Sequence, residues 1–137
     1  IIERSDTPLG GVPNDISGGV GTPKWTANIT TNYSVGPMSF QLQMRHVDSS
    51  IMNTRWVEGV DVDDNSVPSS TWFNGQIGYN GETANGASWT VGFNVQNILD
   101  RTPPIIASFN SRSGSQSIND SYDVFGRRYA LNVNYNF

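Results

Sequence analysis

Apolar and polar side chains alternate with period two along several parts of this chain. In the C-terminal stretch, apolar or aromatic positions from Tyr129 to Phe137 alternate with Arg128, Ala130 and asparagines. Successive side chains of a β-strand point to opposite faces, so this stretch predicts a strand over 128–137 with one apolar face and one polar face. The same alternation predicts further strands over 24–35, 38–47, 71–80 and 88–98.

The connections between the predicted strands are alternately short and long. A tight link at 36–37 and a turn at 81–87 join strands that follow closely, whereas 48–69 and 99–126 are long loops. Loops above about 12–15 residues are uncommon in compact soluble domains. Short turns at one rim and long loops at the other are typical of transmembrane β-barrels, whose strands cross the bilayer with about 9–11 tilted residues. The predicted fold class is therefore all-β, an antiparallel up-and-down meander.

The two faces of the predicted strands differ in a way that favours a membrane barrel. Within the strands the polar face carries mainly Asn, Gln, Thr and Ser, and Arg45 is the clearest charged exception. A sheet exposed to water normally uses more charged side chains for solubility, so neutral amides suit a wet barrel interior. Aromatic side chains stand near both ends of the apolar face, as interfacial girdles do. The expected lipid-facing girdle comprises Trp25, Tyr33, Phe40, Phe73, Tyr79, Trp89, Tyr129 and Tyr135.

Composition narrows the classes of function. The chain has 137 residues, enough for one modest domain, and no apolar run reaches the length of a membrane-spanning helix. A net charge of −4 without a basic stripe argues against nucleic acid as a partner. The absence of cysteine excludes thiolate chemistry, and the single histidine, His46, excludes a histidine cluster. No catalytic motif stands out, so we expect neither an enzyme nor a cofactor.

The long loop over 48–69 contains an acidic cluster. Asp61, Asp63 and Asp64, followed by Asn65, offer oxygen ligands of the kind that Ca²⁺ prefers. The spacing is not that of an EF-hand, because neither the glycine nor the distal glutamate follows in register. A solvated acidic loop without metal is the favoured interpretation. The same three aspartates, together with Trp56, are also candidates for contact with a transported ligand.

Three arginines offer positive charge at candidate ligand positions. Arg45, on the polar strand face, is a candidate for contact with an anionic ligand, although pairing with a neighbouring acid is the commoner arrangement. Arg127 and Arg128 either bind lipopolysaccharide phosphate or pair with Asp120 and Asp123, and pairing is slightly favoured.

Three segments, taken together, resemble one protein family. The first segment is Gln96-Asn97-Ile98-Leu99-Asp100-Arg101-Thr102-Pro103-Pro104. It resembles the segment of TonB-dependent outer-membrane receptors in which a strand ends in Asn-Leu-Phe-Asp and prolines follow. Here Ile-Leu replaces the common Leu-Phe. The second segment is Tyr122-Asp123-Val124-Phe125-Gly126-Arg127-Arg128-Tyr129, which resembles the run that opens the last strand of these receptors. The terminal Phe137 resembles the aromatic residue that ends that strand. Pro23-Lys24-Trp25 resembles the proline-led start of an earlier strand, so the likeness spans roughly 23–137.

The resemblance implies a location and a function. Residues 1–22 would be the remnant of an extracellular loop, and 23–137 the last five strands of a large transmembrane β-barrel in the bacterial outer membrane. The barrel would take up a scarce nutrient, such as a ferric siderophore or an oligosaccharide. Its energy would come from TonB through a plug domain that this chain lacks. The implied partners are outer-membrane lipid, a small-molecule ligand and the barrel-assembly machinery, which would recognise Tyr135 and Phe137.

Other interpretations of the pattern stay open. A small or oligomeric outer-membrane barrel acting as a porin or adhesin fits the same alternation, as does a soluble β-sandwich that binds carbohydrate through its tryptophans. The chain begins Ile1-Ile2, which suggests a mature product or an excised piece. Five strands cannot close a barrel, so we expect this chain alone to form no pore.

Overall fold

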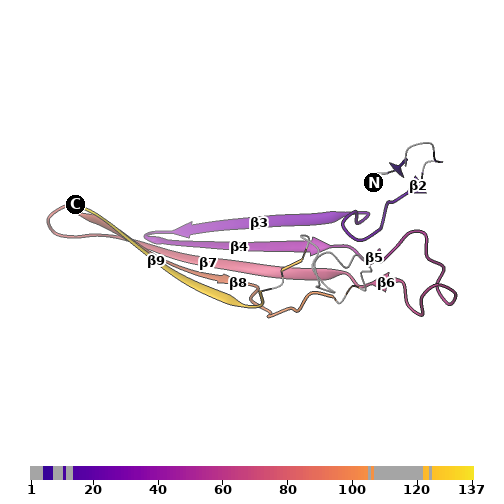
Figure 1. Ribbon diagram of the computed structural model, residues 1–137. Coiled ribbons are helices and arrows are strands. Elements are labelled where there is room, and N and C mark those ends of the chain that lie inside the picture. The colour runs from indigo at the N-terminus through magenta and orange to yellow at the C-terminus, as the bar shows by residue number, and fades with distance from the viewer. Residues whose placement is uncertain (1–4, 8–10, 12–13, 105, 107–121, 124) are drawn as a thin grey trace. The chain divides into compact units, whose positions relative to one another are not determined.

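The computed structural model describes residues 5–7, 11, 14–104, 106, 122–123 and 125–137. All elements in these ranges are β-strands, which form one five-stranded antiparallel sheet and two small two-stranded sheets (Figure 1). The prediction of an all-β fold is therefore confirmed. Within the described ranges, no helix combines the length and apolar character needed to cross a membrane.

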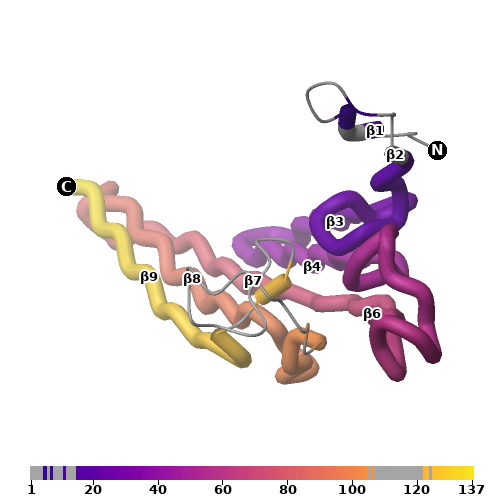
Figure 2. Tube along the Cα trace, turned by 45° about the vertical axis from the view of Figure 1, so that its right-hand side comes forward, coloured from indigo at the N-terminus to yellow at the C-terminus, as the bar shows by residue number. Residues whose placement is uncertain are grey.

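The large sheet is a meander in which strand order follows chain order. Neighbouring strands run side by side, as β7, β8 and β9 do in Figure 2. Each strand begins and ends within two residues of its predicted range; the fourth stops at Gln96 because Asn97, at φ 52°, leaves the extended region. The strands are β3 (Thr26–Val35), β4 (Met38–Val47), β7 (Ser70–Glu82), β8 (Ser88–Gln96) and β9 (Arg128–Asn136).

Short turns join β3 to β4 and β7 to β8, as the pattern predicted. Gly36 in the first turn adopts φ 53°, a conformation that glycine reaches with little strain. In the second turn, the backbone N–H of Thr83 donates to the carbonyl of Ala87 at 2.8 Å, and the Thr83 hydroxyl donates to the same oxygen at 3.0 Å. Such tight closures fix the register of each hairpin, and hence the face on which every side chain lies.

The two small sheets occur in segments that were expected to be loops without strands. β1 (Ser5–Asp6) pairs with β2 (Asn14–Asp15), and β5 (Ser50–Ile51) pairs with β6 (Ser66–Val67), each antiparallel. The expectation of strand-free loops over 1–22 and 48–69 was therefore wrong at these positions. Two-residue strands contain too few side chains for an alternating pattern to appear in the sequence.

The chain falls into two compact units, and their cores differ. One unit comprises Ile1–Ala27, His46–Ser70 and Thr102–Val124; the other comprises Asn28–Arg45, Thr71–Arg101 and Phe125–Phe137 and contains most of the large sheet. Among the described residues of the first unit, Val47, Val67, Ile106 and Tyr122 are buried apolar side chains. In the described part of the sheet unit only Trp72 and Ala87 are. The sheet unit therefore leaves most of its apolar side chains outside any core.

Candidate functional site: the two faces of the sheet

Strand register places the apolar side chains of β7, β8 and β9 on one common face. Residues directly opposite each other in neighbouring strands share a face and lie about 5 Å apart. Each apolar position of β8 has partners in both of its neighbours. Across β7, β8 and β9 the rows are Gly81, Trp89 and Tyr135; Tyr79, Val91 and Val133; Ile77, Phe93 and Leu131; and Gly75, Val95 and Tyr129.

This apolar face is open to the surroundings. On β9, Leu131 is 67 % exposed and Val133 is 64 % exposed, and Ile29 on β3 is 56 % exposed. Burying one such side chain stabilises a protein by about 1.5–3 kcal/mol, and large contiguous apolar patches are rare on soluble monomers. We therefore expect another molecule or another part of the protein to cover this face, which makes it the candidate functional surface.

Aromatic rings on this face contact one another in pairs. Tyr79 stacks on Trp89 with ring centroids 5.5 Å apart, and Phe93 stacks on Tyr129 at 6.1 Å. The indole of Trp89 lies across Gly81, where a Cβ would overlap it, so a glycine is needed for this ring position. Two further pairs are Tyr33 with Phe40 and Tyr135 with Phe137.

Six of the eight predicted girdle residues belong to these rows or pairs. The remaining two, Trp25 and Phe73, are placed differently. Trp25, just before β3, stacks on His46 near the end of β4 with ring centroids 4.5 Å apart, and both residues belong to the first unit. Phe73 is half-buried on β7, and its carbonyl accepts the N–H of Ile98 at 2.8 Å.

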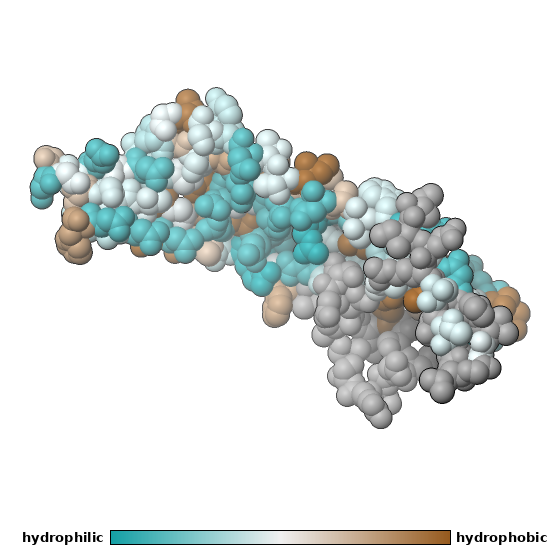
Figure 3. Space-filling model, turned by 90° about the horizontal axis from the view of Figure 1, so that it is seen from above, coloured by the Kyte–Doolittle hydropathy of each residue, from teal (hydrophilic) through white to brown (hydrophobic). Residues whose placement is uncertain are grey.

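The opposite face carries a chain of amide side chains joined by hydrogen bonds. Gln43 donates to Asn28 at 3.0 Å, and Asn74 donates to Gln43 at 2.9 Å. The backbone N–H of Asn97 then donates to the Asn74 side-chain oxygen at 2.9 Å. These bonds cross the sheet from β3 to the end of β8 and satisfy polar groups without any charge. Figure 3 shows one side of the molecule, on which hydrophilic side chains run as a band and apolar ones are scattered.

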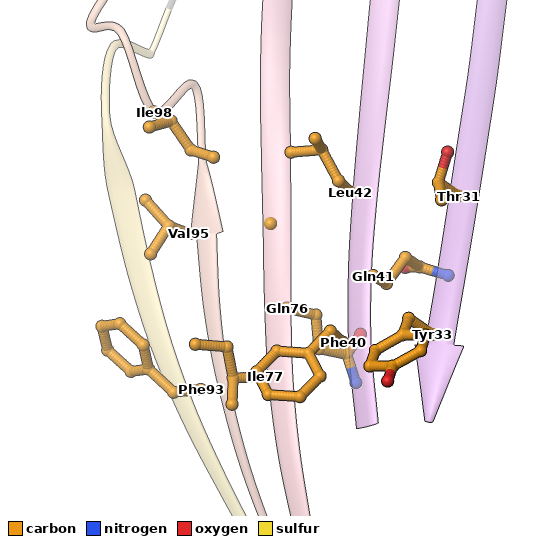
Figure 4. A pocket seen from close by; sticks show the side chains of 11 residues that line it. Thr31, Tyr33, Phe40, Gln41, Leu42, Gln76, Ile77, Phe93, Val95 and Ile98 are labelled. Atoms are coloured by element: carbon orange, nitrogen blue, oxygen red, sulfur yellow. The ribbon is translucent and has the colours of Figure 1, made fainter. Parts of the chain in front are cut away.

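A hollow lies on each face of the sheet beside Gly75, which has no side chain on the apolar face to which its position belongs. On the polar face a hollow of about 310 Å³ is lined mainly by amides, among them Gln41, Asn74 and Asn94. On the apolar face a groove of about 410 Å³ runs between β4 and β8, with Leu42 and Val95 among its walls. Figure 4 shows the labelled side chains of this apolar groove. The alternating pattern along a single strand gives no sign of either hollow.

The segment that resembles the receptor family forms a turn centred on Asn97. Asn97 is completely buried, and its side chain both donates to the carbonyl of Arg101 at 2.8 Å and accepts its N–H at 2.9 Å. The side chain of Asp100 accepts the backbone N–H of Arg127 at 2.9 Å, just before β9 begins. Asn and Asp tolerate the left-handed conformation that both residues adopt. Physically, the motif ends β8 and positions the start of β9.

The carboxylates of the acidic loop are used in local turns. Asp61 accepts the N–H of Val57 at 2.8 Å, and Asp64 accepts the N–H of Ser66 at 2.8 Å. Hydrogen bonds from Ser66 hold the pKa of Asp64 below its ordinary value, and a bond from the Ser17 backbone does the same for the pKa of Asp15. Among the described residues, no group of three or more His, Cys, Asp or Glu side chains is arranged to hold a metal ion.

Asn65 is the residue that organises this loop. It is 6 % exposed, donates to the carbonyls of Asn53 and Trp56 at 2.9 and 3.3 Å, and accepts the Asn53 N–H at 3.1 Å. The neighbouring Asp63 is exposed. Sequence reasoning treated Asn65 only as a member of the acidic cluster, because burial of one polar side chain leaves no local pattern.

Replacing Asn65 with alanine is expected to loosen this loop without affecting the sheet. Three hydrogen bonds disappear, among them the bond that the half-buried Asn53 N–H donates to the Asn65 side chain, at a cost of about 1–3 kcal/mol. Hydrogen exchange of the Asn53 amide should then accelerate at least about tenfold. Asp63→Ala serves as the matched control and should leave that exchange rate unchanged. Equal rates in both variants would show that Asn65 does not hold the loop.

The candidate ligand contacts are divided between the two units. Trp56, Asp61, Asp63 and Asp64 lie in the loop before β6, whereas Arg45 is exposed on β4 in the sheet unit.

The arginines at the start of β9 contact aromatic rings. Arg127 donates to the hydroxyl of Tyr129 at 3.5 Å, and this contact raises the pKa of the guanidinium. The guanidinium of Arg128 lies 4.8 Å from the ring centre of Phe125. The pairing expected with Asp120 lies outside the described residues.

Comparison with known proteins adds no identity. No family model, no curated protein and no solved structure matches the chain. The functional interpretation therefore depends on the two faces of the sheet.

Proposed function

We propose that the sheet is part of the wall of a transmembrane β-barrel in the bacterial outer membrane. The observation that carries this proposal is the exposed apolar face of the meander, on which side chains from successive strands align row by row. Lipid is a cover that this face fits, because the outer surface of such barrels is an apolar band with aromatic residues near its edges. The opposite face, with its uncharged amide chain, then borders the wet interior.

The edges of the sheet support the same proposal. β3 and β9 are the outermost strands of the described sheet, and nearly all residues of both are exposed. An unsatisfied backbone group in lipid costs several kcal/mol, and closed barrels avoid this cost by pairing every strand. Further strands of the same barrel would pair with β3 and β9.

The barrel type that we propose is a TonB-dependent receptor. The support is the resemblance of three segments, together with the role of one of them in the structure: the Asn97 turn ends one strand and positions the next. Such a receptor would take up a siderophore-bound iron or an oligosaccharide, with energy supplied by TonB through a plug domain. Tyr135 and Phe137 at the end of β9 would be recognised by the barrel-assembly machinery.

Solubility tests the membrane part of the proposal with the chain as it is. Because the apolar face needs lipid or detergent, residues 1–137 should aggregate in buffer and stay dispersed and β-rich in detergent micelles. Analytical ultracentrifugation and circular dichroism report these two properties. A folded, monomeric product in detergent-free buffer would exclude every membrane interpretation and favour the soluble carbohydrate-binding module.

Uptake tests the receptor part. Cells that express the complete gene should accumulate a radiolabelled ferric siderophore or oligosaccharide only when TonB is present. Accumulation that is equal with and without TonB would instead identify a passive porin.

A further inference from the structure

The apolar groove at Gly75 has a defined shape. Its 410 Å³ lie within the range of small-ligand sites. In Figure 4, Leu42, Val95 and Ile98 lie toward one end, and Tyr33, Phe40, Ile77 and Phe93 form a row toward the other. Gly75 forms part of its floor, and the Ile98 side chain approaches to within 3.1 Å of the position that a Cβ at Gly75 would take. A hydrocarbon chain is the occupant that such a long, apolar and uncharged groove fits.

A positive charge stands beside this groove. Tyr129 is directly opposite Val95, and its ring stacks on Phe93; both partners line the groove. Arg127 donates to the Tyr129 hydroxyl at 3.5 Å, which places its guanidinium on the apolar side of the sheet. Adjacent strands are about 4.8 Å apart, so β9 and the groove floor on β7 are separated by only about 10 Å.

The surroundings of Arg127 leave its charge available. Arg127 is exposed and forms no ion pair with any described residue. The nearby acid, Asp100, accepts the backbone N–H of Arg127 and also contributes to the raised pKa of its side chain. A cation at the rim of an apolar face, next to an aromatic ring, matches a phosphate at the depth of lipid headgroups.

We propose that this surface binds lipopolysaccharide, with a lipid A phosphate on Arg127 and one acyl chain in the Gly75 groove. The inference rests on the proposed membrane location and extends it to a specific lipid site. Arg127 precedes β9 at the rim that carries the long loops, which faces outward in the proposed orientation. The outward leaflet of an outer membrane is where lipid A occurs, so charge, groove and position favour the same molecule.

The test uses the full-length gene product, purified in detergent and mixed with defined lipids. Native mass spectrometry should detect retained hexa-acylated lipid A carrying two phosphates. Dephosphorylated lipid A should be retained about fivefold less, since it loses the charge contact. This comparison needs no variant and therefore does not depend on variant folding.

Variants then separate headgroup from chain. Arg127→Gln should lower lipid A retention about fivefold. Gly75→Val should lower it about tenfold, because the added side chain enters the groove beside Ile98, whose Cδ1 lies 3.1 Å from an added Cβ. The matched control for Arg127→Gln is Arg55→Gln, at an exposed position in a loop. The matched control for Gly75→Val is Gly92→Val, because an added Cβ at Gly92 meets nothing within 4 Å. The residue opposite Gly92, Asn132, belongs to the polar face. Both controls should retain lipid A like the unchanged protein.

Each outcome decides a different point. Retention that is unaffected by Gly75→Val and Arg127→Gln overturns the proposed site, as does equal retention of phosphorylated and dephosphorylated lipid A. Stronger retention of phosphatidylglycerol than of lipid A overturns the choice of lipopolysaccharide. A protein found in the outer membrane without lipid A contradicts this inference alone, whereas a soluble protein contradicts the proposed function itself.

Discussion

Val133→Arg in the full-length protein should assemble poorly in the outer membrane, whereas Asn132→Arg should assemble like the unchanged protein. Val133 lies in the middle of β9, on the apolar face, opposite Val91. In a bilayer, an arginine at the lipid-facing midplane of a barrel costs about 2–4 kcal/mol. Asn132 is the next residue along the strand and faces the other side, where Gly92 opposite it leaves open space.

This pair of variants is informative because both substitutions introduce the same side chain and the same charge one position apart in the same strand. The main difference between them is the face of the sheet that receives the charge. The measurement is the folded fraction in the outer membrane, read from heat-modifiable gel mobility after cell fractionation. Equal folding of the two variants would contradict lipid on the Val133 face, and poor folding of Asn132→Arg alone would reverse the assignment of the two faces.

The long strands could be predicted from the sequence because each carries its own signal. Along β9, every second side chain from Tyr129 to Tyr135 is apolar and nearly every intervening one is polar, so the pattern alone fixes both the strand and its two faces. The strand ends were less predictable. β7 continues to Glu82 because its pairing with β8 persists past Gly81, where the backbone allows the Trp89 ring to lie across it.

The grooves and the Arg127 contact could not be predicted, since they depend on register between strands. Gly75 becomes a groove floor only because Leu42 and Val95 flank it from other strands. Arg127 and Tyr129 are two residues apart, yet their contact matters only because Tyr129 stacks on Phe93, 36 positions earlier in the chain. The alternation of apolar and polar residues along one strand is visible in a single sequence. The grooves and the Arg127 contact, in contrast, depend on how two or three strands are paired.

The receptor-like segment, 96–104, could be predicted from the sequence only in part. Its likeness was visible in the sequence, but its physical role was not, because the partners of Asn97 and Asp100 are backbone groups. Any sequence offers backbone N–H and carbonyl groups at every position, so a pattern search cannot reveal which of them a side chain binds. The structure joins both residues to one turn between β8 and β9.

Asn97→Ala is expected to destabilise the sheet by about 3 kcal/mol, the second large effect predicted for this chain. The completely buried Asn97 makes two side-chain bonds to Arg101, and its removal leaves both backbone groups of Arg101 without them. Alanine also tolerates the left-handed φ of 52° poorly. Urea unfolding of the full-length protein in detergent, followed by tryptophan fluorescence, measures the change.

Two further variants separate the contributions of backbone and side chain at Asn97. Asn97→Gly accepts the left-handed conformation but lacks both bonds, so it should recover only about 1 kcal/mol relative to alanine. Asn97→Asp keeps the acceptor for the Arg101 N–H but buries a carboxylate against the Arg101 carbonyl, so it should be no more stable than the glycine variant. Hydrogen exchange of the Arg127 amide, which is bonded to Asp100, reports the same turn locally. It should accelerate most in the variant that loses most stability. If alanine unfolds no earlier than the unchanged protein, or if glycine restores stability completely, the side-chain bonds of Asn97 do not hold β8 and β9 together, and the receptor-like segment has another role.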